Sequence, residues 1–282
     1  MTGEDARDLV LSIRRQMWIS SGLRFVLLVG ITAGIVATPF YAETSALLNI
    51  IWMTSAFCGI AWVSLTALSL RQIRAANQAV VYMASGRLDL AQSQFISAAN
   101  QFTLYKQGKL MACHNLAVVI HGQGHFEAAA NLCDGVVSWR RKPLKPLGWT
   151  SRLLLADCRL SLGDTPAARA ALEPLSMKEP SINLEEQLLL LAIDTRCKVT
   201  SGSHAAAIDD LPWKIRRAEL LESPRAALVH LLLSEACRRT GDLAKADFLQ
   251  RRAELYYDTT ELFEDYPGLR NLLSNATSAD NI

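Results

Sequence analysis

Hydrophobic residues are concentrated in two uncharged runs near the start of the chain. FVLLVGITAGIVATPFYA covers residues 25–42, and ALLNIIWMTSAFCGIAWVSLTALSL covers residues 46–70. At a rise of ~1.5 Å per residue these runs form helices of about 27 and 37 Å, against a hydrocarbon core of about 30 Å. Because only residues 43–45 join them, the pattern predicts a hairpin of two antiparallel transmembrane helices.

Residues 1–24, before the first run, are amphipathic. Ala6, Leu9, Val10, Ile13 and Met17 share one face of a helix, and the arginines of this segment lie mostly on the opposite face. Two interpretations stay open. The segment lies along the membrane interface, or it is an ordinary helix that flanks the span.

After residue 70 a glycine is followed by an alanine five residues later, and the pair recurs five times. The spacings between successive pairs are 38, 39, 39 and 39 residues, and the pairs are Gly86/Ala91, Gly124/Ala129, Gly163/Ala168, Gly202/Ala207 and Gly241/Ala246. Small residues also stand seven positions before each glycine: Ala79, Ala117, Ala156, Thr195 and Ser234. Glycine permits a left-handed turn, and small residues permit two helices to cross closely. The pattern predicts five helical hairpins.

This pattern resembles the tetratricopeptide repeat, in which antiparallel helix pairs stack into a superhelix. The best matching stretches are NLAVVIHGQGHFEAAANLCDGVV from Asn115 and QAVVYMASGRLDLAQSQFISAA from Gln78. The observed period exceeds the usual ~34 residues, which indicates longer helices or loops. We therefore expect an all-α protein with an amphipathic segment (1–24), spans at 25–42 and 46–70, a solenoid of about five repeats (71–258) and a capping helix with a frayed tail (259–282).

Charge determines the expected orientation. Four arginines precede the first span and three follow the second, whereas the connecting loop has neither lysine nor arginine: Arg7, Arg14, Arg15 and Arg24, then Arg71, Arg74 and Arg87. Basic residues stay on the cytoplasmic side, so both termini and the repeats are expected there. The net charge of only +2 argues against a nucleic-acid partner. Six cysteines without paired spacing argue against a disulfide framework or a zinc ribbon.

No motif of the sequence indicates a catalytic centre or a cofactor site. His121 and His125, with His114 nearby, suggest a metal site, but Gly122 and Gly124 separate the first two across a predicted turn. A tight turn with solvated imidazoles is the favoured interpretation. We therefore expect that the protein is not an enzyme and binds neither a cofactor nor a metal.

The loop WRRKPLKPLGW combines basic and aromatic residues between the second and third repeats. Its cations are Arg140, Arg141, Lys142 and Lys145. It is either a rigid connection with tryptophans packed at the seam or a basic patch for lipid headgroups or an acidic partner.

The resemblance to tetratricopeptide repeats implies a concave groove lined by the first helix of each repeat, where peptides or partner helices bind. By register from the glycines, its polar lining is Asn77, His114, Asp157, Arg196, Glu235 and Arg238. The lysine, asparagine and arginine pattern with which some members clamp a carboxylate is absent from the corresponding positions.

The favoured function is a non-enzymatic, membrane-anchored scaffold that recruits protein partners, including membrane proteins or peptide segments, and contacts lipid through its two spans. The order of parts resembles that of HemY-type bacterial inner-membrane proteins. This resemblance implies a location in the bacterial inner membrane and an accessory role there. One alternative is a subunit of a larger membrane complex that uses the hairpin as its interface, with Gly30 and Gly34 packing helices closely. A metal-binding or enzymatic module around His114, His121 and His125 is another.

Overall fold

The computed structural model describes residues 1–37, 45–139, 147–176, 183–266 and 269, and within these ranges it is helical without a strand. The chain divides into two compact units, residues Met1–Trp139 and Arg140–Ile282. The all-α solenoid expected from the glycine spacing is confirmed.

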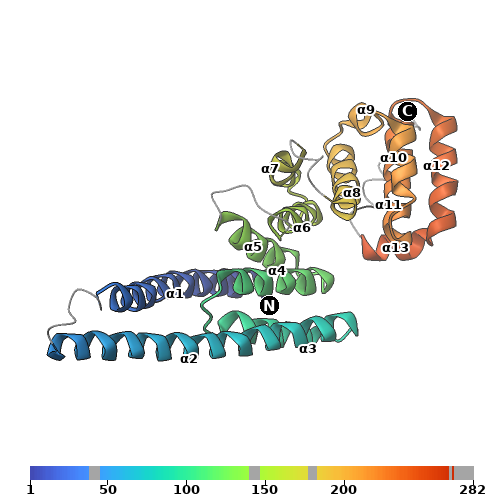
Figure 1. Ribbon diagram of the computed structural model, residues 1–282. Coiled ribbons are helices and arrows are strands. Elements are labelled where there is room, and N and C mark those ends of the chain that lie inside the picture. Colours follow the sequence, from blue (N-terminus) through green and yellow to red (C-terminus); the bar gives the residue numbers. More distant parts are fainter. Residues whose placement is uncertain (38–44, 140–146, 177–182, 267–268, 270–282) are drawn as a thin grey trace. The chain divides into compact units, whose positions relative to one another are not determined.

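The first unit holds two long helices and three shorter ones. They are α1 (Gly3–Ala37), α2 (Ser45–Ala84), α3 (Leu88–Asn100), α4 (Lys106–Gly122) and α5 (Phe126–Ser138) (Figure 1). Helix α1 continues through the expected boundary at residue 24, and α2 continues through that at residue 70. The second apolar run and the first helix of repeat one are therefore a single helix.

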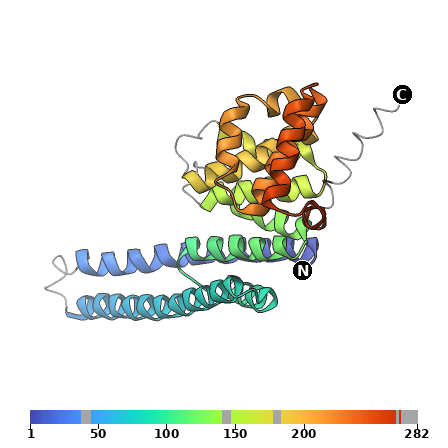
Figure 2. The same cartoon turned by 90° about the vertical axis from the view of Figure 1, so that its right-hand side faces the viewer.

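Helices α1 and α2 lie antiparallel and side by side, as both ribbon views show (Figure 2). Gly30 faces Cys58, whose sulfur would lie 2.7 Å from an added Cβ, and Gly34 faces Ser55 in the same way. The small-residue spacing of the sequence is thus used within the hairpin itself. Both helices are long and apolar enough to cross a membrane.

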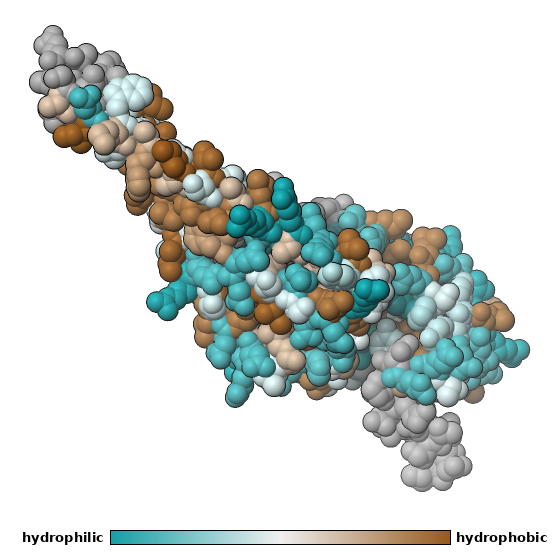
Figure 3. Space-filling model, turned by 90° about the horizontal axis from the view of Figure 1, so that it is seen from below, coloured by the Kyte–Doolittle hydropathy of each residue, from teal (hydrophilic) through white to brown (hydrophobic). Residues whose placement is uncertain are grey.

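The hairpin exposes large apolar side chains. Phe25, Trp52, Met53, Phe57 and Ile60 are each more than half exposed. Hydrophobic residues dominate the visible surface of this hairpin, whereas the repeats are largely hydrophilic (Figure 3). A large exposed apolar surface of this kind marks a site of interaction with a membrane or with protein.

The N-terminal half of α1 packs against protein. Its apolar residues Ala6, Leu9, Ile13 and Met17 are buried, and the helix lies along α5 and α3. Of the two interpretations left open for this segment, the structure therefore supports the flanking helix rather than a helix on the membrane surface.

The second unit contains the remaining repeats and the cap. Its helices are α6 (Leu147–Ser161), α7 (Thr165–Ser176), α8 (Leu184–Thr200), α9 (His204–Ala207), α10 (Leu211–Ala218), α11 (Ser223–Arg239), α12 (Leu243–Tyr256) and α13 (Thr259–Asp265). Of the expected cap, α13 is described, and Leu262 and Leu269 pack into the core of the last repeat. Residues 270–282 lie outside the described ranges.

All five repeat glycines occupy the left-handed region that the sequence predicts, with φ between 74° and 87°. The alanine five residues after each glycine is fully buried, and the small residue seven positions before it is at most 2% exposed. Both small residues of each hairpin are therefore buried as the pattern predicts, and in repeat five the Ser234 hydroxyl donates to the Ala246 carbonyl at 2.7 Å.

Candidate binding groove

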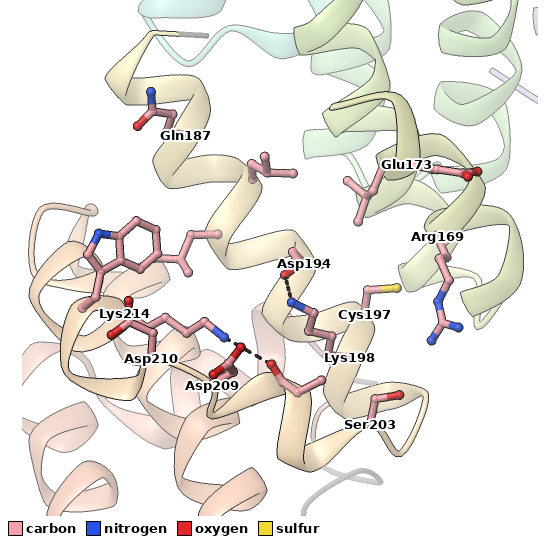
Figure 4. A pocket seen from close by; sticks show the side chains of 15 residues that line it. Arg169, Glu173, Gln187, Asp194, Cys197, Lys198, Ser203, Asp209, Asp210 and Lys214 are labelled. Atoms are coloured by element: carbon pink, nitrogen blue, oxygen red, sulfur yellow. Dashed lines mark hydrogen bonds and ion pairs between the residues drawn. The ribbon is translucent and has the colours of Figure 1, made fainter. Parts of the chain in front are cut away.

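A groove of about 860 Å³ lies in the second unit. Helix α8 forms its floor, and α7 on one side and α9 with α10 on the other form its walls (Figure 4). These are the second helix of repeat three and both helices of repeat four.

The groove is bordered by an irregularity of the fourth repeat. Its second helix stops after the single turn of α9, and the chain resumes as α10 at Leu211 with a proline in the first turn. Between them Asp210 adopts a left-handed conformation, with φ of 49°. Pro212 explains the break, because its ring and missing N–H prevent a helix from continuing through this position.

Floor and walls of the groove both combine apolar and charged residues. The apolar lining consists of Leu172, Leu190, Leu191, Cys197, Ala206 and Trp213. Burial raises the pKa of the Cys197 thiol, which keeps this side chain a neutral apolar group at pH 7. An amphipathic ligand would match such a lining.

All three basic groups in the groove, Arg169, Lys198 and Lys214, are bonded to the protein itself. The Lys198 ammonium lies 2.6 Å from a carboxylate oxygen of Asp194. The buried Lys214 ammonium donates to the carbonyls of Ala207 at 2.7 Å and Ala206 at 3.3 Å, at the end of α9. Desolvation by burial is the main reason that the pKa of Lys214 is lowered.

The exposed charges of the groove form its rim. Arg169 and Glu173 lie on α7, and Arg169 donates to the Ser201 hydroxyl at 2.9 Å. On the opposite side Asp209 and Asp210 are exposed between α9 and α10. The rim is therefore acidic along α9–α10 and of mixed charge along α7.

The six groove residues expected from the sequence lie on first helices of repeats, and none of them lines this cavity. They are Asn77 on α2, His114 on α4, Asp157 on α6, Arg196 on α8, and Glu235 and Arg238 on α11. Asn77 is exposed, whereas burial lowers the pKa of His114 to about 4.

Four of these residues form ion pairs inside the second unit. Arg196 donates to Asp157 at 2.8 Å and joins α8 to α6, the first helices of two successive repeats. Glu235 is 1% exposed and lies 2.7 Å from Arg239 and 3.5 Å from Arg238 on its own helix. The Arg196–Asp157 pair therefore links two successive repeats, whereas the Glu235 pairs lie within α11.

The structure gives the two histidines of the HGQGH turn different surroundings. His121 lies in the last turn of α4 and packs edge-on against Phe126 with ring centres 5.2 Å apart, while His125 is exposed just before α5. The described residues contain no group of three or more histidine, cysteine or acidic side chains that could hold a metal ion.

The basic residues Arg140, Arg141, Lys142 and Lys145 lie outside the described ranges, so the role of this loop stays a prediction. The residue before it is described. The Trp139 ring lies 5.9 Å from the guanidinium of Arg14 and 6.0 Å from the ammonium of Lys106. It therefore packs within the first unit.

Sequence reasoning missed the groove on α8, although one signal for it was present. Asp209, Asp210 and Pro212 interrupt what the repeat pattern predicts as a helix, and aspartate followed by proline is typical of a new helix start.

Comparison with known proteins supports the repeats directly. The family model described as Tetratricopeptide repeat matches residues 110–134 and 149–174, which cover parts of the second and third hairpins. No curated protein and no solved structure matches the chain. The five hairpins, their left-handed glycines and this match together show that the chain carries a tetratricopeptide-like helical solenoid.

Proposed function

We propose that this protein is a membrane-anchored, non-enzymatic scaffold whose repeats bind protein partners at the cytoplasmic face. One observation carries the proposal: helix α2 is both an apolar helix long enough to cross a membrane and the first helix of the solenoid. A continuous helix holds repeat one directly against the bilayer, since no flexible linker intervenes.

The flanking charges support the orientation. Seven arginines lie on the repeat side of the hairpin and no basic residue lies in its connecting loop. The Arg24 guanidinium lies 6.0 Å from the centre of the Trp62 ring. A cation beside tryptophan is typical of the boundary between hydrocarbon and headgroups. By likeness in the order of parts to HemY-type proteins, we place the chain in a bacterial inner membrane.

Labelling in whole cells tests anchoring and orientation. A cysteine at Glu43 in the connecting loop should react with a membrane-impermeant maleimide, while Asp247→Cys on α12 should react only after permeabilisation. The protein should also stay in the pellet after alkaline carbonate extraction. The opposite labelling pattern, or release by carbonate, would contradict the proposal.

Partner binding is tested by a photo-crosslinking amino acid in native membranes. At Glu173, on the groove rim, it should give a discrete protein adduct that is absent when the same group replaces Asp247 on α12. The double variant Asp209→Lys/Asp210→Lys should reduce that adduct. A chain that gives no adduct at Glu173, with the repeats folded, does not use this groove for a partner.

The alternative of a complex subunit that uses the hairpin as its interface has weaker support. The exposed apolar side chains of α1 and α2 suit lipid as well as a partner helix, and Gly30 and Gly34 already pack against α2. We therefore favour the repeats as the binding surface.

A further inference from the structure

The first unit contains a groove of the same kind as the groove on α8, and helix α1 occupies it, with an open cavity of about 470 Å³ left between α1 and α3. Helix α1 lies between α3 and α5, the second helices of repeats one and two, and reaches the first turns of α4. The groove on α8 lies between the second helices of repeats three and four. Both are grooves between successive repeats with the intervening first helix as floor.

Counting from the repeat glycines shows that equivalent positions line the two grooves. Residues beside α1 and residues around the open groove correspond as follows: Gln92 to Arg169, Ile96 to Glu173, Lys109 to Gln187, Cys113 to Leu191 and Gly135 to Trp213. A sixth pair is Asn131, whose side chain donates to the Gly3 carbonyl of α1 at 3.1 Å, and Asp209. The match in register extends along the floor and both walls of the groove.

The filled groove shows how a helix fits such a site. The buried stripe of α1 packs inward, and Val10 approaches α5 so closely that a Cβ on Gly135 would lie 2.7 Å from its methyl groups. Gly3 and Val10 lie on the edge of α1 that faces α5, and the helical period places Arg7 on the same edge.

The open groove differs in two ways that define its occupant. Trp213 replaces Gly135, so a helix there must present a small residue where α1 has Val10. Asp209 and Asp210 stand along the α9–α10 wall, whereas the equivalent positions of the first groove are Asn131 and Leu132. Two exposed carboxylates favour basic residues on the facing edge of the ligand.

We propose that the groove on α8 binds an amphipathic helix of a partner protein, with its apolar stripe on Leu190, Leu191 and Trp213 and basic residues along Asp209 and Asp210. This inference rests on the proposed scaffold function and specifies its partner. The partner helix occupies repeats three and four as α1 occupies repeats one and two.

A peptide made from α1 provides the probe. It has the sequence of residues 3–20 with Val10→Ala, which leaves room for Trp213, and it carries a fluorophore. The full chain is held in neutral lipid nanodiscs, and fluorescence anisotropy measures binding. We expect micromolar or tighter binding and at least a tenfold loss with the exposed double variant Asp209→Lys/Asp210→Lys. The matched control Asp247→Lys/Glu254→Lys, on exposed positions of α12, should bind as the unmodified chain does.

Three further arms make each outcome decisive. A probe with Ile13→Pro should not bind, and equal binding would mean that an extended peptide is accepted and the helix inference is wrong. Equal binding to both double variants would place the probe elsewhere and overturn the site. Binding only to a chain that ends at Leu269 would assign the groove to the protein's own tail, which also overturns the proposal.

The experiment separates this inference from the function beneath it. A specific crosslinked adduct at Glu173 together with no probe binding would leave the scaffold intact and refute the helical ligand. Loss of both adduct and probe binding would refute the use of this groove altogether.

Discussion

The two grooves between repeats have the same construction and opposite occupancy. In the first unit Gly135 has no side chain, and α1 packs into the space that it leaves. In the second unit the equivalent residue is Trp213, the wall is broken between α9 and α10, and a cavity of about 860 Å³ remains. The same kind of groove thus holds the chain's own helix in the first unit and is open in the second, and the two differ in the residues of one wall.

Replacing Gly135, on the wall of the first groove, by tryptophan should have the largest effect on the difference between the two grooves. Gly135→Trp places a large ring against Val10, and overpacking of this kind costs about 3 kcal/mol, the upper end of the usual range. We expect helix α1 to lose hydrogen-exchange protection from Gly3 to Met17 while the second unit keeps its own. Unchanged protection of α1 would show that Gly135 does not control the packing of this helix.

Substitution of the turn glycines should lower the stability of the repeats around both grooves equally. Gly124→Ala and Gly202→Ala each force a Cβ into the left-handed region, at a cost of about 1–2 kcal/mol. The control is Gly122→Ala, on the exposed end of α4 with open space around it, which should be neutral or stabilising by about 0.5–1 kcal/mol. Thermal unfolding of the three variants measures the effect. Equal midpoints for Gly122→Ala and Gly124→Ala would contradict the assigned turns.

A smaller, pH-dependent effect should arise at Lys109 in the first unit. Lys109 is 1% exposed beneath α1, where its ammonium donates to the Ala99 carbonyl at 3.0 Å and to Gln16. Burial lowers its pKa from an ordinary value of 10.5 to about 8. Between these two values the unfolded chain binds the proton and the folded chain does not, so the contribution of this lysine to stability rises as the pH increases from 8 to 10.5. The buried Cys113 thiol, whose pKa burial raises from 9.0 to about 12, opposes that rise above pH 9.

Replacement of the lysine tests this assignment. Lys109→Met should lower the slope of the unfolding midpoint against pH between 8 and 10.5, because methionine does not titrate. Lys245→Met, at an exposed position of α12, is the control and should leave that slope unchanged. An equal slope in Lys109→Met and in the unmodified chain would contradict the assignment.

The sequence predicted the repeats because their determinants are local. A glycine and two small residues set each turn and crossing, so five hairpins follow from spacing alone. The packing of α1 could not be chosen from its amphipathic pattern, since lipid and protein cover an apolar face equally well. That pattern becomes decisive only when α3 and α5 are placed beside it.

The candidate site was harder to predict because it arises from an exception to the repeat. Register placed Asp157 and Arg196 at equivalent positions, and the structure joins them as an ion pair between successive helices. The open groove depends on Pro212, which interrupts a helix, and on Trp213, which stands where the second repeat has a glycine. A pattern shared by five repeats cannot reveal what one of them changes.

The occupancy of the two grooves is tested most directly by equivalent cysteines. Asn131→Cys lies beneath α1, and Asp209→Cys lies on the open rim at the same position relative to the repeat glycine. The six native cysteines are buried thiols outside any disulfide, so labelling with a soluble maleimide reports chiefly the introduced thiols. We predict that Asp209→Cys reacts at least ten times faster than Asn131→Cys, and that Gly135→Trp raises the rate at Asn131→Cys. Equal rates at the two positions in the unmodified background would contradict a filled first groove and an open second one.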